Sequence, residues 1–359
     1  MNSLGEHHLR LGANLAPDQI PLDYGDLRAE FDSALNGAIL LDRSHEGRIL
    51  LSGRDRLNLV NRMSTNDVAG LAINEGCATV FTNANARILF RAVCLSRPEG
   101  LLLISEAGQG GALVAFLRRN IFFGDQVAVS DISGTTSQFA IHGASAQRVI
   151  EALSAEGADL PLMGSADLEA VGSQFTLARR KPIYGEHWLV ICSAENARAL
   201  HRLLLQKGAA SGLKPAGSLT YNALRIRSGR PAALELSADY IPLEVGLWDE
   251  VSFSKGCYTG QEIIARMESR GRLAKALVKL AMSSIVAAPA TVYVEGRAIG
   301  LLTSSVKAAN GESYGLAVVR LNYARPGMRL NIGEESVEAM VIEFAGTQPP
   351  YVAQLLQEE

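Results

Sequence analysis

One segment of the chain combines side chains that could do chemistry: residues 255–262, which read Lys-Gly-Cys-Tyr-Thr-Gly-Gln-Glu. Lys255 stands two positions before Cys257, and a helical pattern over residues 262–267 begins shortly after it. A neighbouring positive charge and a helix N-terminus both lower the pKa of a thiol, and the thiolate is its nucleophilic and metal-binding form. We therefore expect Cys257 to be the functional thiol of this protein.

The other cysteines have a different setting. Cys77, Cys94 and Cys192 stand in apolar segments with the pattern of strands, where a thiol packs as a small hydrophobic group. No two of the four cysteines form a Cys-x-x-Cys pair, and none stands at the Cys/His spacing of a zinc site. The sequence therefore predicts no metal site.

Three arginines, Arg225, Arg227 and Arg230, gather where a helix over residues 219–228 should end. Cations at a helix C-terminus are favoured by the helix dipole, which would make the arginines structural. Guanidinium groups also bind carboxylates in bidentate fashion, which would make them a site for an anionic ligand. The spacing alone favours neither interpretation.

The elements that must position these residues are short helices and strands in mixed order. They do not alternate strictly, and no glycine-rich phosphate turn follows a strand, which favours an α+β fold over a Rossmann sheet. Six short strand candidates follow residue 272, at 277–282, 290–294, 298–303, 314–319, 328–332 and 337–344. This spacing predicts a small β-barrel or sandwich. We expect a flexible polar leader over residues 1–25, an α+β region over 26–271 and a β-barrel domain over 272–359.

Composition restricts the partners and the compartment. The chain has 359 residues and a formal charge of −3, which gives no global attraction to nucleic acid or to an anionic membrane, although a local basic patch is compatible with it. The N-terminus lacks the pattern of a signal peptide, and no apolar segment reaches the length of a membrane span. We expect a cytoplasmic protein with free thiols, no membrane partner and no direct contact with nucleic acid.

The segment 255–262, followed by Ala265 and Arg266, resembles the signature of the YgfZ-type folate-binding proteins. These proteins are related to the T-protein of glycine cleavage, an aminomethyltransferase. The resemblance covers residues 30–345 approximately, with further matching residues at Gly53, Asp55, Thr65-Asn66-Asp67, Leu224-Arg225, Pro242-Leu243-Glu244 and Val251-Ser252-Phe253.

The resemblance implies a three-lobed ring, made of two related α+β lobes and a C-terminal β-barrel around a channel that holds tetrahydrofolate. It implies that Arg225 holds the glutamate tail of the folate and that Cys257 is the functional thiol. The other residues that it places at the cofactor are Lys255, Gly256, Tyr258, Gln261, Glu262 and, as a pocket neighbour, Glu186.

The chain departs from the T-protein pattern at the carboxylates. Where the T-protein has an aspartate pair near the folate, this chain has Phe90 and Arg91, so acid–base or electrostatic help from this position is missing. Where the T-protein has a Gly-Glu-Asp-Gly stretch leading to a pteridine-binding acid, this chain has Gly185, Glu186 and His187, and only Glu186 is acidic. We therefore do not expect the glycine-cleavage reaction itself.

Three functions follow from these residues. The first is a tetrahydrofolate-binding factor for the assembly or maintenance of iron–sulfur clusters, acting through Cys257, with client or assembly proteins as partners and tRNA modification as an indirect outcome. The alternative is a folate-dependent one-carbon transferase or demethylase, similar to an aminomethyltransferase, with an unknown substrate. A third is a scaffold whose channel binds a protein or RNA, and the net charge disfavours RNA.

Overall fold

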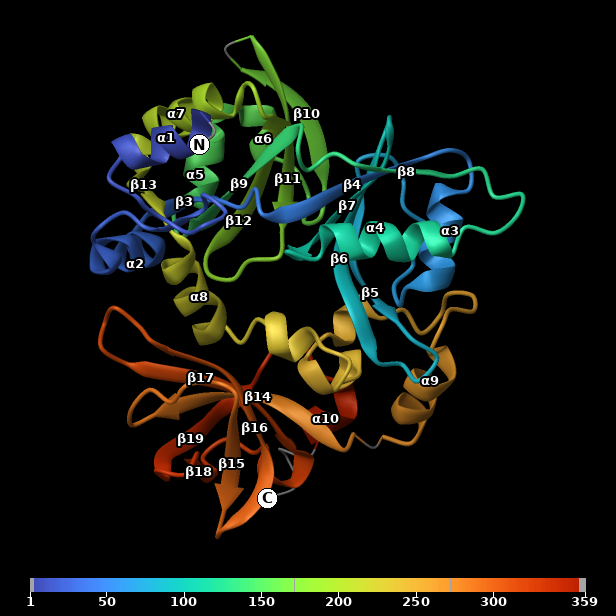
Figure 1. Ribbon diagram of the computed structural model, residues 1–359, viewed down its shortest axis with the longest axis vertical. Helices are drawn as coiled ribbons and strands as arrows, with labels where there is room; N and C mark the ends of the chain where they lie inside the picture. Colours follow the sequence, from blue (N-terminus) through green and yellow to red (C-terminus); the bar gives the residue numbers. More distant parts are fainter. Residues whose placement is uncertain (1–2, 171, 272, 355–359) are drawn as a thin grey trace. The chain divides into compact units, whose positions relative to one another are not determined.

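The computed structural model describes residues 3–170, 172–271 and 273–354 (Figure 1). The described residues combine helices with two larger open sheets, a two-stranded sheet of β1 (Asn14–Leu15) and β2 (Pro21–Asp23), and one closed barrel, which confirms the predicted α+β class. It divides into two compact units. The first unit comprises Met1–Val60, Val68–Cys77 and Ala92–Leu224, and the second comprises Asn61–Asp67, Ala78–Arg91 and Arg225–Glu359.

A six-stranded sheet forms the larger part of the first unit. Its strand order is β10-β11-β12-β9-β3-β13, antiparallel except for the pair β13/β3. The strands are β3 (Ala38–Asp42), β9 (Thr136–Gly143), β10 (Ser165–Ala170), β11 (Ser173–Arg180), β12 (Glu186–Ser193) and β13 (Leu213–Ala216). The helices α5 (Ala146–Leu153) and α7 (Ala197–Gly208) pack on one face.

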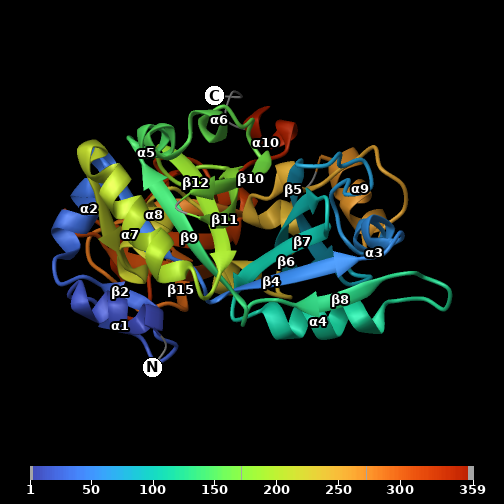
Figure 2. The same cartoon turned by 90° about the horizontal axis from the view of Figure 1, so that it is seen from above.

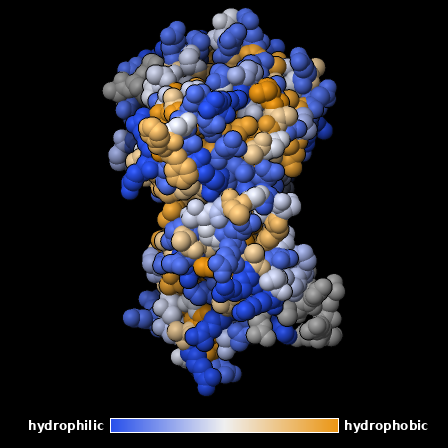
Figure 3. Space-filling model, turned by 90° about the vertical axis from the view of Figure 1, so that its right-hand side faces the viewer, coloured by the Kyte–Doolittle hydropathy of each residue, from blue (hydrophilic) through white to orange (hydrophobic). Residues whose placement is uncertain are grey.

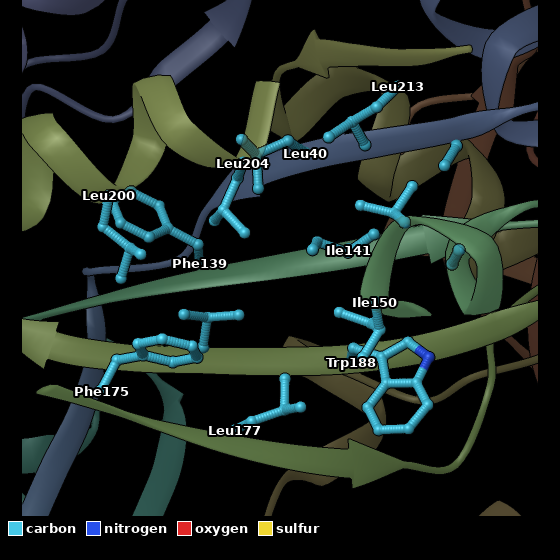
Figure 4. Close-up of a cluster of buried hydrophobic side chains, with 14 of the residues drawn as sticks. Leu40, Phe139, Ile141, Ile150, Phe175, Leu177, Trp188, Leu200, Leu204 and Leu213 are labelled. Atoms are coloured by element: carbon cyan, nitrogen blue, oxygen red, sulfur yellow. The ribbon is translucent and has the colours of Figure 1, made fainter. Parts of the chain in front are cut away.

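Alternation along these strands produces the core of the first unit, because successive side chains point to opposite faces. On β9, Phe139 and Ile141 enter a cluster with Trp188 of β12 and with Leu200 and Leu204 of α7 (Figure 4). All five side chains are buried, and removing their apolar surface from water stabilises this layer.

A five-stranded sheet has the strand order β5-β6-β7-β4-β8. It is not confined to the first unit, because β5 and β6 each have residues in both units. Its strands are β4 (Glu46–Ser52), β5 (Gly76–Thr82), β6 (Ile88–Arg97), β7 (Gly100–Ala107) and β8 (Ala128–Asp131). The helix α4 (Gly110–Arg119) packs on β4, β7 and β8 (Figure 2), and α3 (Arg56–Met63) leads from β4 toward β5.

The prediction of a flexible leader over residues 1–25 is wrong for the described residues, and residues 1–2 lie outside them. The segment forms α1 (Ser3–Arg10), β1 (Asn14–Leu15) and β2 (Pro21–Asp23), followed by α2 (Leu27–Asn36). Leu4 joins the core cluster of the first unit, and the fully buried His8 contacts Asp42 with Nε2 3.1 Å from Oδ2. Buried contacts, rather than local sequence, order this segment.

The second unit contains a closed six-stranded barrel of order β14-β17-β16-β15-β18-β19, as predicted for the C-terminal domain. Its strands are β14 (Lys275–Met282), β15 (Ala290–Val294), β16 (Arg297–Lys307), β17 (Ser313–Arg320), β18 (Arg329–Ile332) and β19 (Val337–Phe344). The predicted boundary falls near residue 272, which itself lies outside the described residues, as do residues 355–359. The barrel begins soon after it, but the unit that contains the barrel also takes in everything from Arg225 onward.

Short helices connect these layers. They are α6 (Ala155–Ala158), α8 (Ser218–Arg227), α9 (Gln261–Ser269), α10 (Pro350–Gln354) and the 3-10 turns Ala209–Ser211, Ala233–Leu236, Pro242–Val245, Trp248–Glu250 and Leu321–Tyr323. Among the described residues, no helix has the length and apolar character needed to cross a membrane.

Candidate functional site

Lys255 anchors the cysteine segment to the end of α3. Its Nζ donates hydrogen bonds to the carbonyl oxygens of Asn61 at 2.6 Å, Ser64 at 2.9 Å and Asn66 at 2.6 Å. An ammonium group has three donors, and all three are used here. Carbonyls left over at a helix end need such partners, so Lys255 closes the turn that follows α3. These acceptors are backbone carbonyls of the turn, and an effect of the ammonium charge on the thiol of Cys257 stays a prediction.

The turn that receives Lys255 is itself fixed by buried side chains. Thr65 donates through Oγ1 to the carbonyl of Glu250 at 2.7 Å, and its Oγ1 accepts from the backbone N–H of Val80 at 3.1 Å. Asn66 donates through Nδ2 to the carbonyl of Ala78 at 2.8 Å. The Thr65-Asn66 pair matched in the sequence therefore ties the α3 turn both to β5 and to the segment before Lys255.

Cys257 lies on an exposed loop, whereas Cys94 and Cys192 are buried and Cys77 is half-buried. The loop is fastened after the cysteine, since Thr82 Oγ1 donates to the carbonyl of Thr259 at 2.6 Å. Gly260 then begins α9 with a φ of +86°. Cys257 thus precedes the helix by a full turn of chain, and it presents its thiol to solvent from a loop held at both ends.

The neighbours of Cys257 have separate environments. Tyr258 is buried in a hydrophobic cluster, which raises the pKa of its hydroxyl to about 12, and the Nζ of Lys255 lies 5.1 Å from its ring centroid. Gly256 is exposed, and Gln261 is half-buried. Glu262 forms a solvent-exposed ion pair with Arg266 of the same helix at 2.6 Å.

Arg91 and Glu250 form a buried ion pair where the T-protein pattern has its carboxylates. Arg91 donates through Nε to Oε2 of Glu250 at 2.8 Å and through Nη2 to Oε1 at 2.5 Å. Sequence reasoning noticed the basic residue but missed Glu250, which lies far along the chain. The only signal was its place just before the matched residues Val251-Ser252-Phe253.

Arg225, predicted to hold a folate tail, is engaged within the second unit. Its Nη2 donates to Oγ of Ser304 at 3.0 Å, and its Nη1 lies 3.6 Å from Oε2 of Glu235, which is fully buried. Ser304 in turn donates to Glu235 at 2.6 Å. The three side chains form a compact network in which Arg225 balances a buried carboxylate.

Glu186 belongs to the first unit, apart from the other predicted residues, and it pairs with Arg179 at 3.0 Å. Beyond it, the sheet face opposite the core has a group of side chains that sequence reasoning missed. His142 stacks on His187 with ring centroids 3.9 Å apart, and Arg43 lies 3.9 Å above the ring of Tyr221. The sequence signal that could have indicated this group was the occurrence of histidine in two strands whose other residues are mostly apolar.

The same face has a buried amide with an unused acceptor. Gln138 donates through Nε2 to Glu46, while its Oε1 has no hydrogen-bond partner within the described residues. Because Gln138 and His142 alternate with Phe139 and Ile141 on β9, they point away from the hydrophobic core. No group of three or more His, Cys, Asp or Glu side chains with metal-binding geometry occurs in the described part of the chain.

The chain belongs to the GCVT N-terminal domain family, whose model matches residues 14–255. A putative chloroplastic transferase of Arabidopsis thaliana is 30% identical over 347 residues, which cover 95% of this chain and 78% of the relative. An aminomethyltransferase of Halalkalibacterium halodurans is 26% identical, with 86% of each chain covered.

The fold has a counterpart among solved structures. The glycine cleavage system aminomethyltransferase T from Bartonella henselae superposes with a TM-score of 0.81 and covers 95% of this chain and 96% of its own, at 20% sequence identity. The likeness supports the fold, including the C-terminal barrel.

Proposed function

We propose that this protein binds tetrahydrofolate and transfers a one-carbon group in the manner of an aminomethyltransferase, with an unidentified substrate. The observation that supports it best is the match of the GCVT N-terminal domain over residues 14–255. Relatives that match most of the chain's length are named aminomethyltransferases. Tetrahydrofolate, when bound, would supply the carrier for the one-carbon unit.

The polar face of the six-stranded sheet has chemistry that fits a pteridine. The half-buried rings of His187 and Tyr221 offer flat surfaces for stacking, and Gln138 offers a buried acceptor for a ring N–H. Buried polar atoms are nearly always satisfied, so an acceptor without a donor suits a bound partner. We therefore propose that these three residues bind the pteridine ring.

The two cations predicted at the folate, Arg225 for its glutamate tail and Lys255 elsewhere at the cofactor, already have partners within the protein. Lys255 donates to three backbone carbonyls, and Arg225 balances Glu235. A folate carboxylate would have to replace these contacts, and the exchange would expose buried groups. The tail therefore belongs to other cations, and Arg225 and Lys255 support the architecture around it.

The test is a calorimetric titration of the full chain with tetrahydrofolate. We expect saturable binding, at least about ten-fold weaker in His187→Ala because one ring of the stacking surface is lost. Lys214→Ala, which changes an exposed residue of β13 in the same sheet, is the control and should bind like wild type. Absence of saturable binding by the wild-type protein would overturn the proposal.

Measuring product formation distinguishes a protein that transfers the one-carbon group from one that only binds tetrahydrofolate. Aminomethyl donors, X–CH2–NH2, carry their one-carbon unit at the oxidation level of formaldehyde, so its transfer to tetrahydrofolate needs no oxidant. Mixed with tetrahydrofolate and the protein, they should yield methylene-tetrahydrofolate, ammonia and the free group X–H at a rate proportional to protein concentration. Binding without any product, over a panel of such donors, would contradict the transferase part and favour the second candidate.

The second candidate is the iron–sulfur maintenance factor of the YgfZ type. It is favoured by the solvent exposure of Cys257, which distinguishes this thiol from the buried Cys94 and Cys192. In cells that lack the native copy, Cys257→Ala should fail to restore a cluster-dependent enzyme, while Cys77→Ala should restore it. Full rescue by Cys257→Ala would exclude the thiol. The cytoplasmic location stays a prediction.

A further inference from the structure

The loop between α4 and β8 presents two phenylalanine side chains to solvent. Phe122 is 62% exposed and Phe123 is 110% exposed, the highest value among the large hydrophobic residues that the structure describes as exposed. In two perpendicular views the loop extends beyond the ends of α4 and β8 (Figures 1 and 2). Two adjacent aromatic rings exposed to this extent form an apolar patch that is accessible to a binding partner.

The base of this loop is held firmly. The backbone N–H of Phe122 donates to Oδ2 of Asp125 at 2.7 Å, and the N–H of Gln126 donates to Oδ2 of Asp55 at 2.9 Å. A Cβ on Gly53 would lie 2.1 Å from the carbonyl oxygen of Gln126, so only glycine allows the two segments to come this close. The two rings are therefore fixed at the tip instead of being free to fold back.

Positive charge surrounds the base of the tip. Residues 53–56 and 118–126 contain four arginines and two aspartates, in a chain with a formal charge of −3. Both aspartates, Asp55 and Asp125, accept backbone N–H groups, and Asp55 also pairs with Arg54, whose Nε lies 3.3 Å from its Oδ2. With four arginines and two aspartates, the two segments keep an excess of positive charge, and Arg119 is exposed. Aromatic rings with a collar of arginines are complementary to a surface that is apolar inside and anionic outside.

We infer that the Phe122–Phe123 tip is a peripheral binding site for an anionic lipid bilayer, with the rings among the acyl chains and the arginines at the headgroups. This departs from the expectation of no membrane partner, which rested on the net charge of the whole chain. Attraction to a membrane depends on the charge near the tip and not on the net charge of the whole chain, because screening limits electrostatic attraction to about 10 Å.

A bilayer fits the tip better than a protein does. A stable protein interface buries about 800 Å² on each side, usually around a continuous apolar centre. Phe122 and Phe123 are the only large hydrophobic residues exposed in the described segments 53–56 and 118–126. The face in Figure 3 likewise shows hydrophobic side chains in separate areas among hydrophilic ones. A small convex tip suits insertion between lipids.

Vesicle sedimentation tests the inference on the full chain. We expect binding to phosphatidylcholine vesicles that contain about one third phosphatidylserine, and at least about five-fold less bound protein in Phe122→Ser/Phe123→Ser. Arg54→Gln/Arg119→Gln should lose a similar share, and added salt should release the wild type. Ile73→Ser/Leu162→Ser, which removes two exposed apolar residues from other loops, should bind like wild type.

Phe123→Trp supplies a direct readout. Its added tryptophan emission should shift to the blue with the anionic vesicles and be quenched by brominated lipid. The emission of the wild-type protein, which comes from Trp188 and Trp248, is the control and should not be quenched to this extent. The inference is overturned if the wild type does not sediment with the vesicles, if the Phe122→Ser/Phe123→Ser variant sediments equally well, or if the tip instead mediates self-association in sedimentation velocity.

Discussion

Arg91 and Glu250 neutralise each other at the position where the T-protein pattern has an aspartate, with Nε of Arg91 2.8 Å from Oε2 of Glu250 and both side chains almost fully buried. A carboxylate is thus present, although the local sequence of β6 does not supply it. Because it is paired, Glu250 has its charge balanced inside the protein, and any reaction that uses it must first separate it from Arg91.

Breaking this pair should destabilise the protein strongly. Arg91→Ala or Glu250→Ala leaves one buried charge without its partner, which costs about 3–5 kcal/mol of the free energy of unfolding. Replacing both by apolar residues, Arg91→Met with Glu250→Leu, should restore most of that stability. Urea unfolding of the single and double variants measures it, and an additive loss in the double variant would contradict the coupling.

The four cysteines should differ in reactivity toward a thiol reagent such as a disulfide chromophore. Cys257 is exposed and should react first, with one equivalent released in the native state. Cys192 should be slower by about ten-fold or more, because burial raises its pKa to about 12 and reaction requires local opening. Cys257→Ser should abolish the fast phase, and a fast phase that remains in that variant would refute the assignment.

Two glycines of the cysteine segment should tolerate alanine differently. At Gly260, with φ at +86°, a Cβ would lie 2.7 Å from the carbonyl oxygen of Asn83 and 2.9 Å from Cα of Ala86. We expect Gly260→Ala to lower the free energy of unfolding by about 1–3 kcal/mol. At Gly256 a Cβ would meet nothing within 4 Å, so Gly256→Ala is the matched control. Equal thermal midpoints for the two variants would show that the close approach is absent.

Acid should weaken the first unit through His201. Burial, followed by the nearby His8 and His7, lowers the pKa of His201 from 6.5 to about 3. The unfolded chain therefore binds a proton below pH 6.5 that the folded protein refuses, and stability falls as pH falls. Between pH 7.5 and pH 5 the loss is about 2 kcal/mol. The lowered pKa of His7 acts in the same direction.

His201→Leu should remove most of this pH dependence, whatever its effect at pH 7.5. Asp42 does not interfere, because its lowered pKa makes its contribution disappear only below about pH 3.8, its ordinary value. Urea midpoints of both proteins at pH 7.5 and pH 5 give the comparison. An unchanged difference in the variant would assign the dependence to other groups.

The strand pattern of the C-terminal barrel could be predicted from sequence, because alternation and turn residues act locally. All six predicted strands are present, for example 290–294, with bounds that move by a few residues at most elsewhere. The ordered α1 could not be predicted in this way. Its stability comes from His8 meeting Asp42 and from Leu4 entering a core whose other members lie up to two hundred residues away.

The same distinction between local patterns and long-range contacts applies to the candidate site. That Cys257 precedes a helix and differs from the other cysteines was readable from neighbouring residues, and its exposure agrees with this. The anchoring role of Lys255 could not be predicted, because its acceptors at Asn61, Ser64 and Asn66 come from a turn that is distant in the sequence. Glu250 was missed for the same reason, since only the fold brings it to Arg91.

The closed barrel has a consequence for how the protein behaves under stress. Every strand from β14 to β19 pairs on both sides, so the barrel offers no unpaired strand on which another chain could grow. The two larger open sheets do end in edge strands, β10 and β13 in one, β5 and β8 in the other. Asp167 and Glu169 give β10 a negative edge, and β8 has only four residues. Aggregation on heating should therefore start from the edges of the open sheets and not from the barrel.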